Sequence, residues 1–156
     1  GERAERLMSD VEERATLDVA DGCEAANARE LARVLHVDGK LTVTLLLRAL
    51  VRAQLAFFEA AMAELTGAPA KRVAALLSDR SGSGFRSLYR KTRLPADGAG
   101  AIWAALDVLF EMGPIGSHGE RLTAGRRMVE RVLSRYEGFD AHANAVSRLR
   151  DGGDKP

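Results

Sequence analysis

Apolar side chains recur every three or four positions through most of the chain, which is the period of an α-helix. In the first 20 residues an otherwise charged segment carries one such stripe, formed by Leu7, Val11, Ala15 and Val19. A second helical stripe starts near Glu24 and ends at Asp38-Gly39, a turn pair in which glycine can take the left-handed conformation. No window alternates apolar and polar residues with the β-branched and aromatic enrichment of a strand. The pattern therefore predicts an all-α fold.

The middle of the chain, residues 41–65, is its most apolar part. Charged side chains interrupt it at Arg48, Arg52, Glu59 and Glu64, whereas a membrane-spanning helix needs about 20 consecutive apolar residues. We therefore expect buried helices of a soluble protein here. Thr42 is placed to cap the first of them, because its hydroxyl can accept a free N–H of the first turn. We expect a bend near Ala53-Gln54 that divides the segment into two helices.

Residues 69–93 predict two helices joined by a turn. The first covers about 69–78 and opens on a proline, whose missing N–H costs nothing in a first turn. The turn that follows, residues 79–84, is rich in serine and glycine. Within it, Ser81 or Ser83 can cap a second helix that runs from about Gly84 to Arg93.

Three further helices are expected in the last third of the chain. Asp97 is placed to cap the first of them, and Ser117-x-x-Glu120 forms a capping box for the second. The last, amphipathic helix spans about residues 140–150. We therefore predict eight to nine helices in antiparallel pairs, because their connections are short, within a single all-helical domain over residues 2–150. Residues 151–156 have no apolar anchor and are expected to form a disordered tail.

The composition excludes several kinds of site. The chain has 156 residues but only one cysteine and three histidines, so it cannot build a disulfide framework or a multi-cysteine zinc site. Cys23 has no base near it in sequence, and no carboxylate lies at a triad-like spacing from the histidines, which are His36, His118 and His142. We expect no catalytic residues, no cofactor and no metal, and therefore a protein that is not an enzyme.

Charge is unevenly distributed although the net charge is only +1. Residues 1–39 carry a net charge of −5, residues 40–100 carry +6, and residues 101–156 are neutral. The middle segment either binds an acidic partner or packs against the acidic first segment. We favour the second interpretation, because oppositely charged parts of one fold commonly neutralise each other.

The predicted helix pair over residues 69–93 has the outline of a helix-turn-helix. Arg86, Arg90 and Arg93 lie at i, i+4 and i+7, and arginines in such a stripe can contact phosphates and guanine. The turn is longer than usual, however, and DNA-binding domains commonly carry a stronger basic excess. Nucleic-acid binding is therefore the alternative hypothesis, beside the simpler interpretation of a solvated face.

The loop Ser81-Gly82-Ser83-Gly84 is the closest the chain comes to a phosphate-binding loop. It opens a helix, and helix N-termini bind anions. No strand precedes it, and it lacks a Gly-Lys-Ser/Thr ending. We favour the interpretation that its glycines allow two helices to turn tightly and pack closely.

The middle segment resembles one bacterial family, catalogued as domain of unknown function 2336 and found chiefly in alphaproteobacteria. The resemblance covers about residues 40–110 and is carried by short motifs. These are Leu41-Thr-x-x-Leu45-Leu-Leu-Arg-Ala-Leu50, Phe57-Phe58-Glu59, Arg72-Val73-x-x-Leu76-Leu77-x-Asp79, Gly84-Phe85-x-x-Leu88-Tyr89-x-Lys91 and Leu94-Pro95. The resemblance implies a HEAT-like helical repeat and brings no activity or ligand with it. Where relatives are expected to carry glycine, this chain has Ala53-Gln54.

These observations favour a non-catalytic interaction or scaffold domain of a cytoplasmic bacterial protein, one that binds a protein partner or self-associates. Helical stacks commonly bind proteins in their long grooves. The candidate interaction surface consists of Asp79, Arg86, Tyr89, Arg90, Lys91 and Arg93. Tyr89 could equally cover the core, and Asp79 could instead cap a helix or pair with Arg80 or Lys91. A third hypothesis is a small-molecule pocket near Phe57, Phe58 and Trp103.

Overall fold

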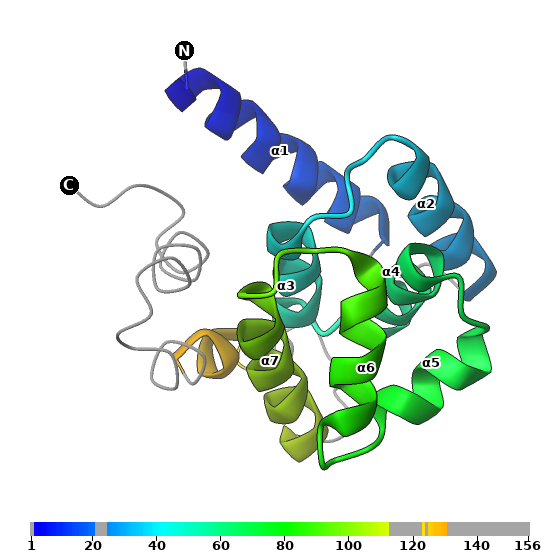
Figure 1. Cartoon of the computed structure of the whole chain (residues 1–156). Helices are drawn as coiled ribbons and strands as arrows, with labels where there is room; N and C mark the ends of the chain where they lie inside the picture. Colours follow the sequence, from blue (N-terminus) through cyan, green and yellow to red (C-terminus); the bar gives the residue numbers. More distant parts are fainter. Residues whose placement is uncertain (1, 21–24, 113–122, 124, 131–156) are drawn as a thin grey trace.

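The computed structural model describes residues 2–20, 25–112, 123 and 125–130, and it is helical wherever regular structure occurs in them (Figure 1). The helices are α1 (Glu2–Ala20), α2 (Ala25–Val37), α3 (Val43–Val51), α4 (Leu55–Thr66), α5 (Ala70–Leu77), α6 (Ser83–Thr92) and α7 (Gly98–Met112), with a further helical segment over 125–130. The all-α prediction is confirmed. The predicted capping box, the helix near 140–150 and the tail lie outside the described residues. None of the described helices is both long enough and apolar enough to cross a membrane.

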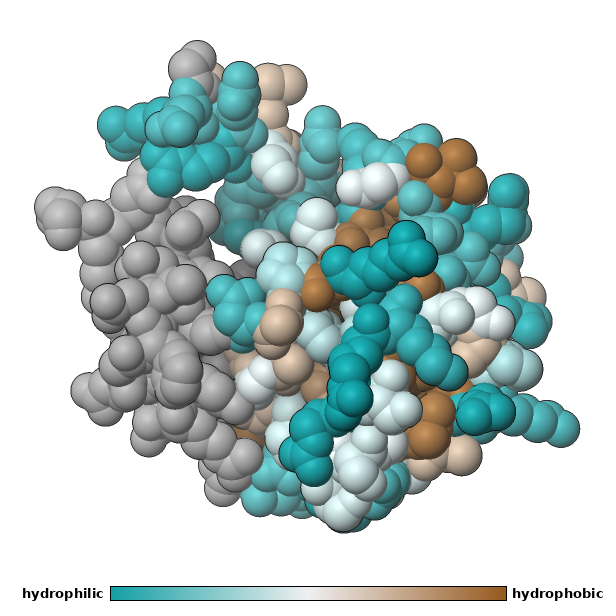
Figure 2. All heavy atoms as spheres, in the orientation of Figure 1, coloured by the Kyte–Doolittle hydropathy of each residue, from teal (hydrophilic) through white to brown (hydrophobic). Residues whose placement is uncertain are grey.

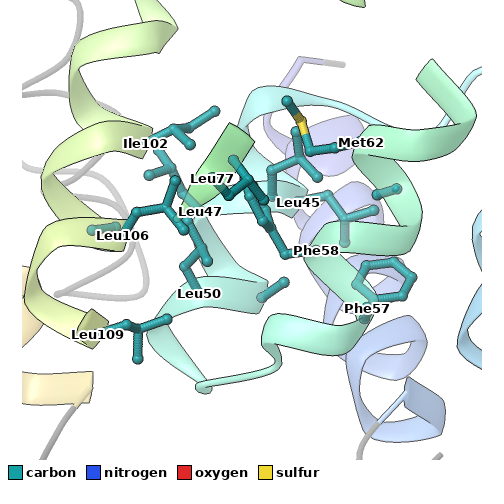
Figure 3. Close-up of a cluster of buried hydrophobic side chains, with 14 of the residues drawn as sticks. Leu45, Leu47, Leu50, Phe57, Phe58, Met62, Leu77, Ile102, Leu106 and Leu109 are labelled. Atoms are coloured by element: carbon teal, nitrogen blue, oxygen red, sulfur yellow. The ribbon is translucent and has the colours of Figure 1, made fainter. Parts of the chain in front are cut away.

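Helices α3 and α4 form the centre of the fold. Helix α4 packs against α2, α3, α5 and α6, and α3 packs against α7. Helix α3 is buried almost all round, as the apolar residues on all its sides predict. Figure 3 shows part of the resulting core, with labelled residues that come from α3, α4, α5 and α7. Its labelled residues are Leu45, Leu47, Leu50, Phe57, Phe58, Met62, Leu77, Ile102, Leu106 and Leu109.

The predicted division of residues 41–65 into two helices is confirmed. Helix α3 ends at Val51 and α4 begins at Leu55. Between them Ala53 takes a left-handed backbone conformation, with φ 58°, which is the conformation that glycine adopts most easily. The buried Gln54 side chain donates a hydrogen bond to the carbonyl of Leu17 in α1 (3.0 Å). Thr42 caps α3 as predicted, because its hydroxyl accepts the N–H of Leu45 at 3.2 Å.

Helix α1 lies at the edge of the fold, and much of it is solvated. Of its residues only Leu17 and Ala20 are buried, and its first half projects away from the other helices (Figure 1). The apolar stripe found in the sequence does not face the body, since Leu7 is 58% exposed and Val11 64% exposed. The side that faces the body is largely polar.

Ion pairs hold α1 to the start and end of α3. Glu12 pairs with Lys40 (2.9 Å) and Asp18 with Arg52 (2.7 Å). Arg48 lies between two carboxylates, pairing with Asp10 and with Glu13 (3.1 Å from Nε to Oε1). Burial raises the pKa of Glu13, while Arg48 and the Thr42 hydroxyl lower it. The acidic first segment therefore neutralises part of the basic middle segment, which confirms the intramolecular interpretation of the charge pattern for these residues.

Candidate functional site

The turn between α5 and α6 is organised by the Asp79 carboxylate. Its Oδ1 accepts hydrogen bonds from the N–H (3.0 Å) and hydroxyl (2.8 Å) of Ser81. Its Oδ2 accepts from the Ser83 hydroxyl (3.0 Å) and the Gly84 N–H (3.1 Å). Gly82, with φ 83°, occupies the N-cap position that the sequence assigned to a serine. Ser81 keeps a share of that role, because its hydroxyl accepts the N–H of Ser83 at 3.3 Å, but Asp79 is the main cap.

This arrangement leaves no phosphate-binding loop at the start of α6. The hydrogen bonds from Ser81, Ser83 and Gly84 lower the pKa of Asp79 to about 2, so the carboxylate is charged at neutral pH. Its negative charge occupies the place where a helix N-terminus would attract an anion. The tight-turn interpretation holds instead: a Cβ on Gly84 would lie 2.5 Å from the carbonyl oxygen of Leu76, so α5 and α6 approach at backbone distance there.

One face of α6 is fixed by aromatic packing. Phe85 stacks on Trp103 of α7 with ring centroids 5.5 Å apart, and its ring lies 5.6 Å from that of Tyr89. Tyr89 is only 4% exposed, so it does not belong to the exposed surface on which the sequence had placed it. Its hydroxyl donates to the carbonyl of Pro95 (2.6 Å), and burial, with a smaller effect of Asp97, raises the pKa of Tyr89 to about 12.

The opposite face of α6 carries four exposed basic residues, Arg86, Arg90, Lys91 and Arg93, which we call the basic row. In the part of the chain that the structure describes, no carboxylate lies within ion-pair distance of any of them. Arg93 takes the left-handed conformation at the helix end, with φ 63°. Figure 2 shows long hydrophilic side chains across the face where α6 lies in front in Figure 1.

The neighbouring Arg80, in contrast, has partners within the fold. It forms an ion pair with Asp107, and its guanidinium lies 5.4 Å from the Trp103 ring centroid and 4.7 Å from that of Phe110. The basic row has no comparable partners among the described residues. Two more exposed basic residues, Lys71 and Arg72 of α5, were not part of the candidate interaction surface predicted from the sequence. The signal that points to them is the composition of residues 65–96, which hold seven basic residues and one acidic residue.

The other candidate sites either fall outside the described residues or are occupied by packing. Cys23, His118 and His142 lie outside, and His36 is exposed at the end of α2. The described residues contain no group of three or more histidine, cysteine, aspartate or glutamate side chains that could hold a metal ion. Phe57 and Phe58, where a pocket was considered, are at most 2% exposed. A shallow cavity of about 210 Å³ lies elsewhere, under α1, and the two carboxylates that line it, those of Glu12 and Glu13, are already paired.

Helices α5 and α6 keep the outline of the predicted helix-turn-helix. They pack against each other and are joined by five residues, 78–82, one or two more than the usual turn. In the described structure Asp79 therefore lies in the turn before α6 and caps its start, and three of the four cations of the basic row lie at its end.

Comparison with known proteins gives one match. Neither a curated protein nor a solved structure matches the chain. A family described as "Uncharacterised protein conserved in bacteria (DUF2336)" matches residues 1–141, which extends the resemblance seen over residues 40–110 to most of the chain. The packing of α3 and α4, the α5–α6 corner and the basic row all fall within the matched residues. The chain belongs to this uncharacterised bacterial family, domain of unknown function 2336.

Proposed function

We propose that the chain is a non-catalytic protein-interaction domain that binds an acidic segment of a partner protein through the basic row of α6. The observation that carries this proposal is the contrast in charge pairing. Lys40, Arg48 and Arg52 are all paired with acids of α1, whereas the basic row is exposed without an ion pair among the described residues.

The rigidity of α6 supports this role. Its other face is buried through Phe85, Leu88 and Tyr89, and its start is fixed by the Asp79 cap and the close approach of Gly84 to Leu76. A preorganised surface binds with a smaller entropy cost than a flexible one. Cations held on one face of a fixed helix can therefore contact carboxylates of a partner without first becoming ordered.

An acidic protein segment fits this surface better than a nucleic acid does. The row covers residues 86–93, about 10 Å at a rise of 1.5 Å per residue, and it contains only four cations. The charged Asp79 lies at the helix start, where a recognition helix usually contacts DNA. The net charge of the chain is only +1, and α1 adds a concentration of acids that would repel a long polyanion.

The test is a binding titration with defined probes. A fluorescein-labelled helical peptide rich in glutamate and leucine, and a labelled DNA duplex of similar length, are titrated with the full chain at low and moderate salt. We expect the peptide to bind with an affinity that falls as salt rises. Trp103 is the only tryptophan and stacks on Phe85 of α6, so its fluorescence provides a second readout close to the row.

Charge-reversal variants locate the binding. Arg90→Glu combined with Lys91→Glu is expected to weaken peptide binding about tenfold or more, because like charges then face each other. The matched control is Arg29→Glu combined with Arg127→Glu, which makes the same change in net charge at exposed positions away from α6. If the control weakens binding as much as the α6 variant does, the attraction is nonspecific and the proposal fails.

Nucleic-acid binding is the second candidate, and the unpaired arginine row is the observation that favours it. Tight duplex binding that is lost on replacing Arg86, Arg90 and Arg93 with alanine, with no peptide binding, would support this candidate and overturn the first. The proposal also includes a cytoplasmic location, with which the bacterial family and the single cysteine agree. It further includes a HEAT-like repeat arrangement of the helices.

A further inference from the structure

Helix α1 has an apolar stripe that faces solvent. Leu7, Met8 and Val11 are 58%, 66% and 64% exposed, and they lie within one turn of each other. The residues of α1 that contact the body, Asp10, Glu13 and Leu17, recur at helical spacing on the opposite side. An exposed apolar stripe rimmed by charges commonly marks a surface that a partner covers.

The charge of α1 indicates what kind of surface covers this stripe. The helix contains six acidic and three basic residues, a net charge of −3. Glu2 and Glu5 are exposed in its projecting half, and neither has an ion pair among the described residues. Pairing α1 with α1 of a second copy would bring two such helices together, and like charges facing each other are destabilising. The charge therefore favours a basic counter-surface.

The basic row offers that counter-surface, but α1 does not contact it within one molecule. Helix α1 packs on α2 and α3, whereas α6 packs on α4, α5 and α7. The free end of α1 projects away from α6 (Figure 1). The projecting half of α1, residues 2–11, has ten residues, the same number as α6, so the two elements match in length as well as in charge.

We infer that copies of this chain associate head to tail, with the exposed half of α1 of one copy docked on the basic row of the next. Glu2 and Glu5 would face Arg90, Lys91 and Arg93, while the apolar stripe would cover the aliphatic stems of these long side chains and the partly exposed Leu94. The inference rests on the proposed function, since it names the acidic partner. An interface of this small size is expected to be transient.

A head-to-tail contact differs from a twofold contact in one measurable way. A head-to-tail dimer keeps an unused basic row on one copy and an unused α1 on the other, so the assembly can grow beyond a dimer. Sedimentation velocity of the full chain should therefore show an average mass that rises steadily with protein concentration and falls again when salt is added.

Two variants, alone and mixed, test the geometry. The α1 variant carries Leu7→Lys and Val11→Lys, and the row variant carries Arg90→Glu and Lys91→Glu; all four positions are exposed, so the fold should be retained, which circular dichroism checks. Each variant alone should remain a monomer. An equimolar mixture has one intact α1 and one intact row, and it should form a dimer that does not grow further. A row variant that still associates, or a mixture that stays monomeric, would overturn the inference.

Titrations with two peptides separate this inference from the proposed function. A labelled peptide of residues 2–20 is titrated into the α1 variant beside the glutamate-rich peptide described above. Binding of both peptides, each weakened about tenfold by the row substitutions, supports the inference. Binding of the glutamate-rich peptide alone overturns the inference and leaves the proposed function standing. If neither peptide binds, both proposals fail.

Discussion

Helices α1 and α6 both carry many charges, but they are held in the fold by different forces. Helix α1 buries only Leu17 and Ala20 and depends on ion pairs with Lys40, Arg48 and Arg52. Helix α6 is held by buried aromatic and leucine side chains and by a close backbone contact at Gly84. Four of the six acidic residues of α1, Asp10, Glu12, Glu13 and Asp18, are therefore engaged in attaching it, whereas the basic row of α6 is available to a partner.

The largest effect is expected from Phe85→Ala. Phe85 is 1% exposed and packs against Trp103 and Tyr89, so its truncation should lower the free energy of unfolding by about 3–5 kcal/mol. The matched change in α1 is Leu7→Ala, which should alter it by less than about 0.5 kcal/mol because Leu7 is exposed. Urea denaturation of both variants measures the difference. Equal losses would show that α1 is packed as tightly as α6.

Removing a single paired charge should have an intermediate effect. Arg48 is 13% exposed and lies between Asp10 and Glu13. Arg48→Met leaves Glu13 without its cation and Asp10 with Arg14 alone (3.3 Å), and it should cost about 2 kcal/mol, less than for a fully buried pair. Hydrogen exchange should accelerate in residues 2–20. Arg90→Met removes an unpaired charge and should leave stability within about 0.5 kcal/mol; a similar loss there would contradict the comparison.

Alkaline pH should lower the free energy of unfolding through Tyr89 of α6. Its pKa is raised to about 12, above the ordinary value of 10.0, so the folded state disfavours the phenolate. The stabilisation from this shift is complete below pH 10 and is lost as the pH rises through about 12. Tyr89→Phe should cost about 1 kcal/mol at neutral pH, for the hydrogen bond to Pro95, and should remove this part of the alkaline loss. Urea midpoints of both proteins from pH 8 to 11 test this.

The smallest effect, a gain in stability, is expected from Arg93→Gly. Arg93 adopts φ 63°, a conformation that costs a side chain about 1 kcal/mol and glycine almost nothing. The variant should unfold at slightly higher urea, up to about 1 kcal/mol more stable, and should bind the acidic peptide more weakly. Ala53→Gly, at φ 58° in the α3–α4 turn, is the control that should gain stability without a change in binding.

Features set by neighbouring residues could be predicted from the sequence. The helical period, the Thr42 cap and the division between α3 and α4 all depend on residues a few positions apart, and they are confirmed. A capping role for Asp79 was one of the alternatives that the sequence left open, but Ser81 and Ser83 were favoured as caps of this helix because Asp79 reaches five residues forward to Gly84, beyond the usual capping distance. The repeat-like arrangement implied by the family resemblance stays a prediction.

Features set by tertiary packing could not be predicted. The period of α1 identifies an apolar stripe, but it does not say which side of the helix meets the body, and ion pairs with Arg48 decide that. Tyr89 has an amphipathic side chain that fits surface and core equally, and the position of Pro95 places it inside. The exposed arginines of the candidate surface could be predicted, because they share one stripe of a single helix.

The two ends of α6 differ in charge because Asp79 caps its start. A fixed negative group lies at its first turn, and Arg90, Lys91 and Arg93 lie at its last. An acidic chain laid along the helix would be repelled at one end and attracted at the other. A partner segment can lie parallel or antiparallel to α6. If its acids are concentrated at one terminus, only the alignment that places them beside the cations is favourable, so this short surface selects the orientation of its partner through charge alone.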